Sequence, residues 1–358
     1  MPKINWSQHW MLIFVPIAMY VEHTTASDPV KFLIAALAII PVARLIGHAT
    51  ENLAHYTGDS VGALLNAMFG NLPELIICIV ALKAGLYSMV AASLIGAILF
   101  NLLLVLGLGF LLGGLRHHTL EFNAKAVSVY TIMMFIATIS MALPSIYQRA
   151  FASSGPSPEQ EAINLGLAVL LIILYGLYLI FMIRTHPEVF ASAGGGHGDE
   201  HGTPWPLGWC IGVLVGASVL AAFLSEILVG AVEGTGEALG LSTPFLGIVL
   251  LASVGGVAEG MSAITMARKG RADLALGIAL GSCILIAIFI APALVFASYF
   301  VGPHYFQLSF STGSFGLLFL AVLIGSLVTS GGTANWYKGV QLLAVYVMIA
   351  LLLYFVPL

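Results

Sequence analysis

Two glutamates stand alone inside long apolar segments, and their carboxylates carry the clearest chemistry in the sequence. Glu74 lies in the run GNLPELIICIVALKAG and Glu259 in the run SVGGVAEGMSAITMARKG. A charge at the centre of a bilayer costs roughly 2.5–3.5 kcal/mol on insertion scales, so a sequence keeps one there chiefly where it faces a cavity or a partner. The basic residues of the two runs, Lys83, Arg268 and Lys269, all stand at their ends. This favours cation or proton binding over a buried acid and base pair made for packing.

The two glutamates occupy the same position in an internal repeat. Shifting the chain by 185 positions lays residues 62–96 on residues 247–281 without a gap and places Glu74 on Glu259. The glycines of the first copy, Gly62, Gly70, Gly85 and Gly96, all fall on glycines of the second copy. Self-similarity at a fixed offset indicates a repeated structural unit. The carboxylates are therefore expected at equivalent places in two copies of one fold.

Residues that can supply further oxygen atoms accompany the glutamates. Asn71 lies on nearly the same helix face as Glu74, beside a glycine and a proline that loosen the helical backbone. Ser253 precedes Glu259 in the second copy, where two glycines follow it. Asn101 is an amide in an apolar helix, suited either to a cation or to a hydrogen bond between helices. Two broken helices meeting at the middle of the membrane would form an oxygen-rich site.

Such a site suits a hard cation. Ca²⁺ takes about six to eight oxygen ligands from carboxylates, carbonyls and water, whereas Mg²⁺ demands a tighter octahedron. The same carboxylates can instead bind protons. Competition between a metal and protons for one pair of glutamates is a sufficient mechanism for exchange.

Further acids lie on the segments that flank the pair. Glu226, Glu233 and Glu237 share one face of a continuous helix, since each residue turns about 100°. This predicts the wall of a cation or proton path, although the last two could already lie at the water interface. In the first copy the corresponding region holds His48 and Glu51, which are assigned to the same path; their spacing does not form the HExxH motif of a zinc hydrolase.

The composition excludes an ordinary soluble domain. Of the 358 residues, 60% are hydrophobic and 8% are charged, whereas about 25% charged residues is usual in soluble proteins. The net charge of −4 is spread thinly, with no basic tract suited to nucleic acid. Cys78, Cys210 and Cys283 have neither zinc-site nor disulfide spacing. We expect a lipid bilayer as surroundings and no cofactor apart from a transported cation; the sequence leaves open whether the protein forms a homo-oligomer.

Apolar segments bounded by proline, glycine or charge predict an all-α membrane protein with about 11 transmembrane helices. The expected spans are 10–26, 30–53, 59–83, 87–115, 121–146, 160–184, 208–239, 243–268, 273–301, 307–330 and 335–356. Residues 1–29 contain an N-terminal transmembrane helix, followed by five-helix repeats over 30–184 and 208–358. Because five is odd, the second repeat enters the bilayer from the opposite face, which makes the repeats inverted in topology.

Positive charge predicts the orientation, because Lys and Arg gather on the cytoplasmic side. Loops on the N-terminal side hold Lys3, Arg116, Lys125, Arg184, Arg268, Lys269, Arg271 and Lys338, and those on the other side hold Lys31, Lys83 and Arg149. The N-terminus is therefore expected in the cytoplasm and the C-terminus outside, and the compact length favours a prokaryotic inner membrane. The linker 185–207 is then cytoplasmic. Its run GGGHGDEHG, with His197 and His201, has the residue types of a metal-sensing loop, but its composition favours a flexible, solvated linker.

These features resemble the cation/proton exchanger family, the calcium/proton antiporter branch of the cation/calcium exchanger superfamily. The run GNLPELIICIVALKAG followed by ASLIGAILFNLLLVLG is similar to the first signature repeat of that family, and GHATENLA and SEILVGAVEGTGEALGLS resemble its gating helices. The resemblance implies that Glu74 and Glu259 are the central cation and proton ligands. It also implies that Asn71 and Asn101 assist them, and that the spans carrying the gating segments move to alternate access.

The second signature departs from the family pattern. Gly256 and Gly260 stand where the family commonly has an asparagine and a histidine. The run Ser282-Cys283-Ile284-Leu285 stands where Ser-Ser-Thr-Gln is usual, so that Ser282 remains as a ligand and Leu285 replaces an amide. Fewer oxygens in this half suit Ca²⁺ less well. The identity of the cation is therefore open.

The sequence predicts a secondary active antiporter, and not an enzyme, that expels Ca²⁺ in exchange for protons by alternating access. Proton- or sodium-coupled exchange of another cation, such as Na⁺, K⁺, Mn²⁺ or Mg²⁺, is the first alternative. A cation channel or an intramembrane enzyme is the remaining one. Inverted repeats with broken helices favour a carrier, and the chain has no HExxH motif.

Overall fold

The computed structural model describes residues 10–57, 62, 65, 68–150, 158–194 and 205–355. Within these ranges the regular structure is helical apart from two short strands. Strands β1 (Leu120–Glu121) and β2 (Thr333–Ala334) pair antiparallel, with Leu120 opposite Ala334. Residues 195–204 of the predicted linker, which include His197 and His201, lie outside the described residues, so its metal-sensing alternative stays a prediction.

The helices follow one another in two similar series. The first half contains η1 (Trp10–Ile13), α2 (Phe14–Glu22), α3 (Asp28–Thr57), α5 (Leu72–Lys83), α6 (Tyr87–Leu99), η2 (Phe100–Val105), α7 (Leu106–His117), α8 (Ala124–Ala150), α9 (Pro158–Ile180), η3 (Phe181–Thr185) and α10 (Pro187–Gly194). The second half contains α11 (Leu207–Gly230), α12 (Val232–Leu239), α13 (Thr243–Phe245), η4 (Leu246–Leu251), α14 (Ala252–Arg268), α15 (Ala272–Leu285), η5 (Ile286–Ile290), α16 (Ala291–Val301), α17 (Thr312–Thr329) and α18 (Trp336–Phe355).

Nine helical stretches in the described part of the chain are long and apolar enough to cross a membrane. They are Asp28–Thr57, Tyr87–His117, Ala124–Tyr147, Pro158–Thr185, Leu207–Leu239, Thr243–Arg268, Ala272–Val301, Thr312–Thr329 and Trp336–Phe355. The first predicted span corresponds to a shorter apolar helix, Trp10–Glu22. The third corresponds to α5, which covers only the C-terminal part of 59–83. The predicted all-α membrane fold is confirmed.

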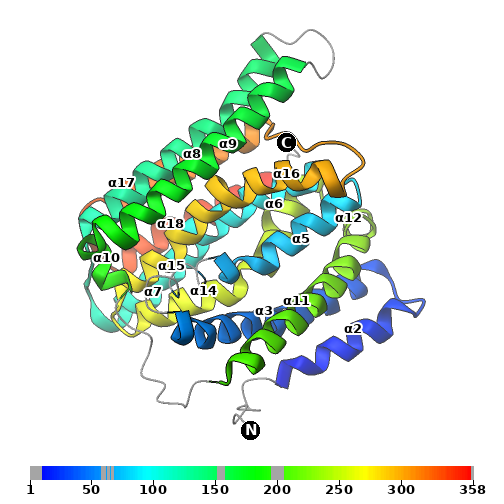
Figure 1. The fold of residues 1–358 in the computed structure, drawn as a ribbon, viewed down its shortest axis with the longest axis horizontal. Helices are drawn as coiled ribbons and strands as arrows, with labels where there is room; N and C mark the ends of the chain where they lie inside the picture. The colour runs from blue at the N-terminus through cyan, green and yellow to red at the C-terminus, as the bar shows by residue number, and fades with distance from the viewer. Residues whose placement is uncertain are drawn as a thin grey trace.

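The helices form a bundle with the repeat helices at its centre. In Figure 1, α3 and α11 run side by side along one edge of the bundle with α2 next to them, and α8 and α9 run along the opposite edge. Between these edges lie α5, α6, α14 and α15, which carry the residues of the repeat. The helices bearing Glu74 and Glu259 are therefore interior helices.

The two copies of the repeat turn back into their next helix in the same way. Gly85 follows α5 and Gly270 follows α14, and both have a φ of +78°. In each copy the residue after this glycine donates its backbone N–H to the carbonyl five residues earlier, at 2.9 Å. This is the Schellman helix ending, which needs a residue free to adopt a left-handed backbone. The offset found in the sequence is thus a repeat of structure as well.

Helices in both halves also change their winding at corresponding places. After α6 the chain continues as the π-helical turn η2, and after α15 it continues as the π-helical turn η5. Such turns are rare and often lie at functional sites. η2 contains Asn101, so the irregular winding helps to set where this amide points.

The predicted span 208–239 is interrupted near its end. α11 ends at Gly230 and α12 begins at Val232, with Ala231 between them at φ −95° and ψ −4°. Glu226 therefore lies on one helix and the other two predicted acids on the next. The two helices still form one membrane-length stretch, Leu207–Leu239, and the shared face of the three acids stays a prediction.

Candidate functional site

Glu74 lies in the first turn of α5, where the sequence dictates a helix start. Asn71 precedes the helix at φ −94° and ψ 14°, and Pro73 occupies one of its first positions. Proline is favoured there because its missing N–H would have no helical partner in any case. The predicted break beside Glu74 is confirmed. A carboxylate in the first turn also lies near the positive end of the helix dipole.

Glu259 lies in the middle of α14, which runs without interruption from Ala252 to Arg268. The prediction of a second broken helix at Gly255 and Gly256 is wrong. A glycine inside a helix costs only about 1 kcal/mol relative to alanine, and unlike proline it keeps its N–H donor. The irregular winding lies just before α14, in the π-helical turn η4.

Each carboxylate packs against a glycine of the other repeat. Gly70 lies so close to Glu259 that a Cβ at position 70 would overlap Oε1 of Glu259. A Cβ at Gly255 would lie 2.8 Å from the Cγ of Glu74 and 3.4 Å from its Oε1. Because Gly70 and Gly255 are equivalent in the repeat, the two contacts mirror one another. The carboxylates thus lie together where α5 packs against α14.

A chain of hydrogen bonds joins four of the predicted site residues. The Nδ2 of Asn71 donates to Oε1 of Glu259 at 3.0 Å, and the Oδ1 of Asn71 accepts a bond from the hydroxyl of Ser282 at 2.6 Å. The Nδ2 of Asn101 in turn donates to Ser282 Oγ at 3.2 Å and to the Ala97 carbonyl at 3.1 Å. These residues come from the N-terminal end of α5 and from η2, α14 and α15, so the structure brings both halves of the repeat to one polar cluster.

Four oxygens of this cluster are buried without a hydrogen-bond partner. They are both carboxylate oxygens of Glu74, Oε2 of Glu259 and Oδ1 of Asn101, and no other buried side-chain nitrogen or oxygen of the described residues lacks a partner. Leaving such a group unpaired costs about 1–3 kcal/mol, and more when it is charged. The arrangement therefore favours the uptake of a proton or a cation.

The donor types in the cluster are those of a hard cation site. Carboxylate and amide oxygens are ligands that Ca²⁺ accepts. The described residues gather no group of three or more His, Cys, Asp or Glu side chains suited to a metal. A cation bound by Glu74 and Glu259 would therefore take its remaining ligands from amide, hydroxyl or carbonyl oxygens or from water.

The other predicted residues lie outside this hydrogen-bonded cluster. The Ser253 hydroxyl donates to the carbonyl of Val249 one turn earlier in the same helical stretch. His48 Nδ1 and Glu51 Oε2 lie 3.4 Å apart on α3, with both side chains partly open to the outside. The acids of the predicted wall, Glu226, Glu233 and Glu237, are all exposed. Their assignment to a cation or proton path stays a prediction.

The sequence did not indicate two neighbours of these residues. Lys83 at the end of α5 places its Nζ 3.1 Å from Oε1 of Glu226 on α11. Phe100, which precedes Asn101, packs against Gly256 of the other repeat. The first contact joins residues 143 positions apart and has no local signal. The contact of Phe100 could have been sought from Gly256, which aligns with Asn71 and leaves room for a side chain from another segment.

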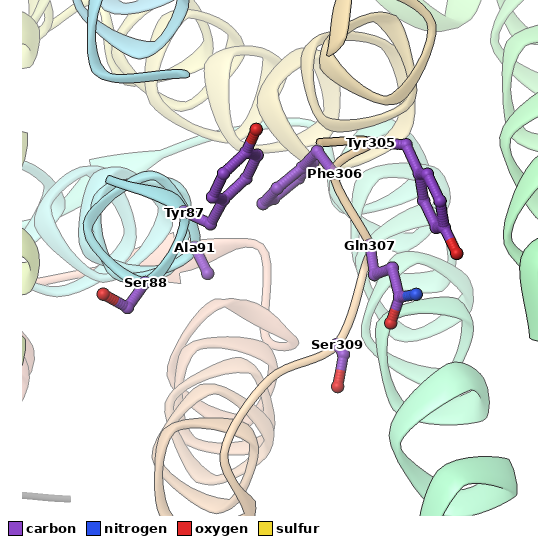
Figure 2. Close-up of a pocket in the computed structure, with 7 residues that line it drawn as sticks. All are labelled: Tyr87, Ser88, Ala91, Tyr305, Phe306, Gln307 and Ser309. Atoms are coloured by element: carbon purple, nitrogen blue, oxygen red, sulfur yellow. The ribbon is translucent and has the colours of Figure 1, made fainter. Parts of the chain in front are cut away.

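A surface pocket lies elsewhere on the bundle. It has a volume of about 260 Å³ and is lined by Tyr87, Ser88, Ala91, Tyr305, Phe306, Gln307 and Ser309. Figure 2 shows Tyr87 beside Phe306, whose rings stack with centroids 6.5 Å apart. None of the carboxylate cluster lines this pocket, so it is a feature of the start of α6 and the segment before α17.

The sequence matches the family described as sodium/calcium exchanger protein over residues 28–184 and 209–355. The chain belongs to this family. A Ca²⁺/H⁺ antiporter of Aphanothece halophytica is 38% identical over 361 residues, which cover 97% of this chain and 96% of the relative. A vacuolar calcium ion transporter of Schizosaccharomyces pombe is 35% identical and covers 97% of this chain and 84% of its own length.

The fold agrees with this membership. The crystal structure of the selenium-substituted Ca²⁺/H⁺ antiporter protein YfkE has a TM-score of 0.82 and 32% identity, covering 98% of this chain and 100% of that one. The resemblance found in the signature repeat is confirmed. This exchanger-family chain is an integral membrane protein, and its named relatives are transporters.

Proposed function

We propose that the protein is a secondary active antiporter that exchanges Ca²⁺ for H⁺, with Glu74 and Glu259 binding the cation and protons in competition. The observation that carries the proposal is the group of buried, unpartnered oxygens between the two repeats. The names of the relatives support the same pair of substrates.

Competition follows from the charges of the pair. Two adjacent buried carboxylates repel one another when both are ionised, so the site without a cation retains protons. A divalent cation neutralises both carboxylates, and protons do the same in its absence. In either loaded form the site carries little net charge through the membrane interior, where an uncompensated charge is costly. The pair thereby couples the outward passage of the cation to the inward passage of protons.

Helices α3 and α11 are proposed as the moving part that alternates access. They lie together along one edge of the bundle (Figure 1). Two of their contacts with the inner helices are the Lys83 and Glu226 pair and a bond from Arg44 Nη2 to the Met261 sulfur at 2.8 Å. An exposed ion pair contributes about 0–1 kcal/mol, so such a contact is readily exchanged when helices slide. Exposed acids on α3, α11 and α12 would line the path.

Uptake into proteoliposomes with an imposed pH gradient tests this proposal. Ca²⁺, Na⁺, K⁺, Mg²⁺ and Mn²⁺ are offered separately while an internal dye reports proton movement. We expect Ca²⁺ to release protons from the vesicles, and Glu74→Gln or Glu259→Gln to abolish this exchange in a folded protein. Glu188→Gln, which changes an exposed glutamate of α10, is the matched control and should behave as the unmodified protein. Proton-coupled uptake retained in either site variant would contradict the proposal.

Exchange of another cation is the second candidate. Asn71 gives Glu259 an amide partner, whereas the oxygens of Glu74 have none. Ca²⁺ takes about six to eight oxygens, so a site with fewer fixed ligands favours a cation that needs fewer oxygen ligands from the protein. In the same vesicles, a response to Na⁺, K⁺, Mn²⁺ or Mg²⁺ without one to Ca²⁺ would select this candidate.

We also propose that residues 30–184 and 208–358 are the two exchanger halves of a prokaryotic inner-membrane protein, with the N-terminus in the cytoplasm and the C-terminus outside. The two family matches support the division, and the distribution of Lys and Arg supports the orientation. A protease-cleavable tag at each end tests it. In right-side-out vesicles, external protease should remove the C-terminal tag and spare the N-terminal one.

A further inference from the structure

Phe100 makes the two halves of the carboxylate site unequal. By the 185-residue offset, Asn71 corresponds to Gly256 and Phe100 corresponds to Leu285. The offset thus aligns an amide in the first copy with a glycine in the second, and a phenylalanine in the first copy with a leucine in the second. The backbone differs here as well, because α5 begins after Asn71 whereas α14 runs through Gly256.

The ring of Phe100 occupies the room that a side chain at position 256 would need. A Cβ at Gly256 would lie 2.9 Å from both Cδ1 and Cε1 of the ring, and 3.7 Å from Oε1 of Glu74. A Cβ at Gly260 would lie 3.4 Å from Cε1 of the same ring. Phe100 is 6% exposed. The aromatic ring and Gly256 therefore fit one another directly beside the Glu74 carboxylate, whereas at Gly260 the nearest atom to a Cβ would be Cγ2 of Val105, at 2.7 Å.

The polar contacts of the two glutamates differ as a result. Glu259 accepts a bond from Asn71, and that amide is held in turn by Ser282. At the equivalent place beside Glu74 stands the hydrocarbon ring, and both oxygens of Glu74 lack a partner. A neighbour that orients a metal ligand typically changes metal affinity by about 10–100-fold.

We propose that Phe100 is a specificity-determining residue of the carboxylate site. Its ring replaces a second amide beside Glu74 and so lowers the preference of the site for Ca²⁺ over a divalent cation with a smaller coordination shell, such as Mn²⁺. This inference rests on the proposed function, because it concerns the cation held by the glutamate pair. Ca²⁺ accepts up to about eight oxygens, whereas Mn²⁺ suits octahedral sites of about six.

A double-mutant cycle in proteoliposomes tests the proposal. Gly256→Asn, Phe100→Leu and the double variant give each position the residue of its repeat equivalent, and the KM for proton-coupled uptake is measured for Ca²⁺ and Mn²⁺. Phe110→Leu is the matched control, since Phe110 is a buried phenylalanine that stacks on Phe122 and lies outside the cluster. Thermal melting in detergent verifies that each variant is folded.

We expect Gly256→Asn alone to lose most uptake, because its amide would overlap the ring, and Phe100→Leu to restore it. In the double variant the KM ratio of Ca²⁺ to Mn²⁺ should fall about tenfold, the lower end of the effect of a ligand-orienting neighbour. Phe100→Leu alone should lower the ratio by less, and Phe110→Leu should not change it.

Two results would overturn the inference. If the unmodified protein transports both ions in a Glu74-dependent manner but the KM ratio of Ca²⁺ to Mn²⁺ is unchanged in Phe100→Leu and in the double variant, the ring does not set selectivity. The proposed function would then still stand. If the unmodified protein shows no Glu74-dependent uptake of either ion, the proposed function fails as well. Recovery of uptake together with the lowered ratio would support the assignment.

Discussion

Removing the amide of Asn71 should weaken cation binding far more than it slows turnover. Its Nδ2 donates to Glu259 Oε1 at 3.0 Å and its Oδ1 accepts from Ser282 Oγ at 2.6 Å. Asn71 is 1% exposed. In Asn71→Ala, a carboxylate oxygen and a hydroxyl of the site therefore lose a buried partner, and Glu259 is free to rotate away from the cation.

The size of the effect follows from the bond that is lost. A hydrogen bond to a charged group contributes about 1.5–3 kcal/mol, and about 1.4 kcal/mol corresponds to a tenfold change in affinity. The KM for the cation should therefore rise by about 10- to 100-fold, which is also the usual range for a neighbour that orients a metal ligand. Turnover at saturating cation should change much less, because the carboxylates themselves remain.

Asn164→Ala is the matched control for this change. Asn164 on α9 is likewise 1% exposed. It also makes two hydrogen bonds, from its Nδ2 to the Phe306 carbonyl at 3.0 Å and from the Leu308 N–H to its Oδ1 at 2.8 Å. Both variants should lower the thermal midpoint, since both leave buried groups unpaired, but Asn164→Ala should keep the KM of the unmodified protein.

The assay is the initial rate of cation-driven proton movement in proteoliposomes, measured over a range of cation concentrations at fixed pH. Melting of the purified variants, followed by intrinsic tryptophan fluorescence, is recorded in parallel. An unchanged KM in Asn71→Ala would refute the role of the amide. An equal rise in KM in Asn164→Ala would show that the effect comes from general loosening of the bundle.

Three further outcomes are expected. Gly255→Ala should abolish uptake in a folded protein, because the new Cβ would lie 2.8 Å from the Cγ of Glu74; uptake at the normal rate would disprove the tight packing. Glu226→Gln should lower the uptake rate in part and alter its pH dependence. Lys83→Met should cause only the loss of uptake that is due to the ion pair, and high salt should cause the same loss in the unmodified protein. An unaltered pH dependence in Glu226→Gln would count against a role for Glu226. Ser253→Ala should leave the KM for the cation unchanged, since the Ser253 hydroxyl donates to the Val249 carbonyl. A large rise in KM would show that Ser253 is a cation ligand.

The sequence predicted the paired carboxylates because the repeat carries its own evidence. An isolated glutamate in an apolar segment has several explanations, but Glu74 and Glu259 fall on each other together with four glycines. One aligned pair, Gly85 and Gly270, is explained by the left-handed backbone of both residues. The aligned pair of Gly70 and Gly255 is explained by the close approach of a carboxylate from the other copy.

Contacts between distant segments were harder to predict. The resemblance implied that Asn71 and Asn101 assist the glutamates, but not that Ser282 would link the two amides. The placing of Phe100 against Gly256 depends on how η2 packs on α14, and no local pattern reports that packing. Such contacts arise from tertiary structure, which can override local preference.

Helix breaks were predicted well only where the chemistry forces them. Proline removes a backbone donor, and α5 indeed begins beside Pro73. Glycine only lowers helix stability, and α14 continues through Gly255 and Gly256. The break at Ala231 follows Gly230, but a single glycine in an apolar helix does not specify an interruption.

The central claim, that a cation and protons compete for Glu74 and Glu259, is tested most directly by proton release on binding. Ca²⁺ is added to the purified protein in weakly buffered detergent solution, and the pH change is recorded together with the bound cation. Metal binding to protonated ligands releases protons, and the apparent affinity then rises with pH. We predict release with the unmodified protein, stronger binding at higher pH, and loss of both binding and release in Glu74→Gln and Glu259→Gln. Ca²⁺ binding that releases no protons and does not depend on pH would contradict the account.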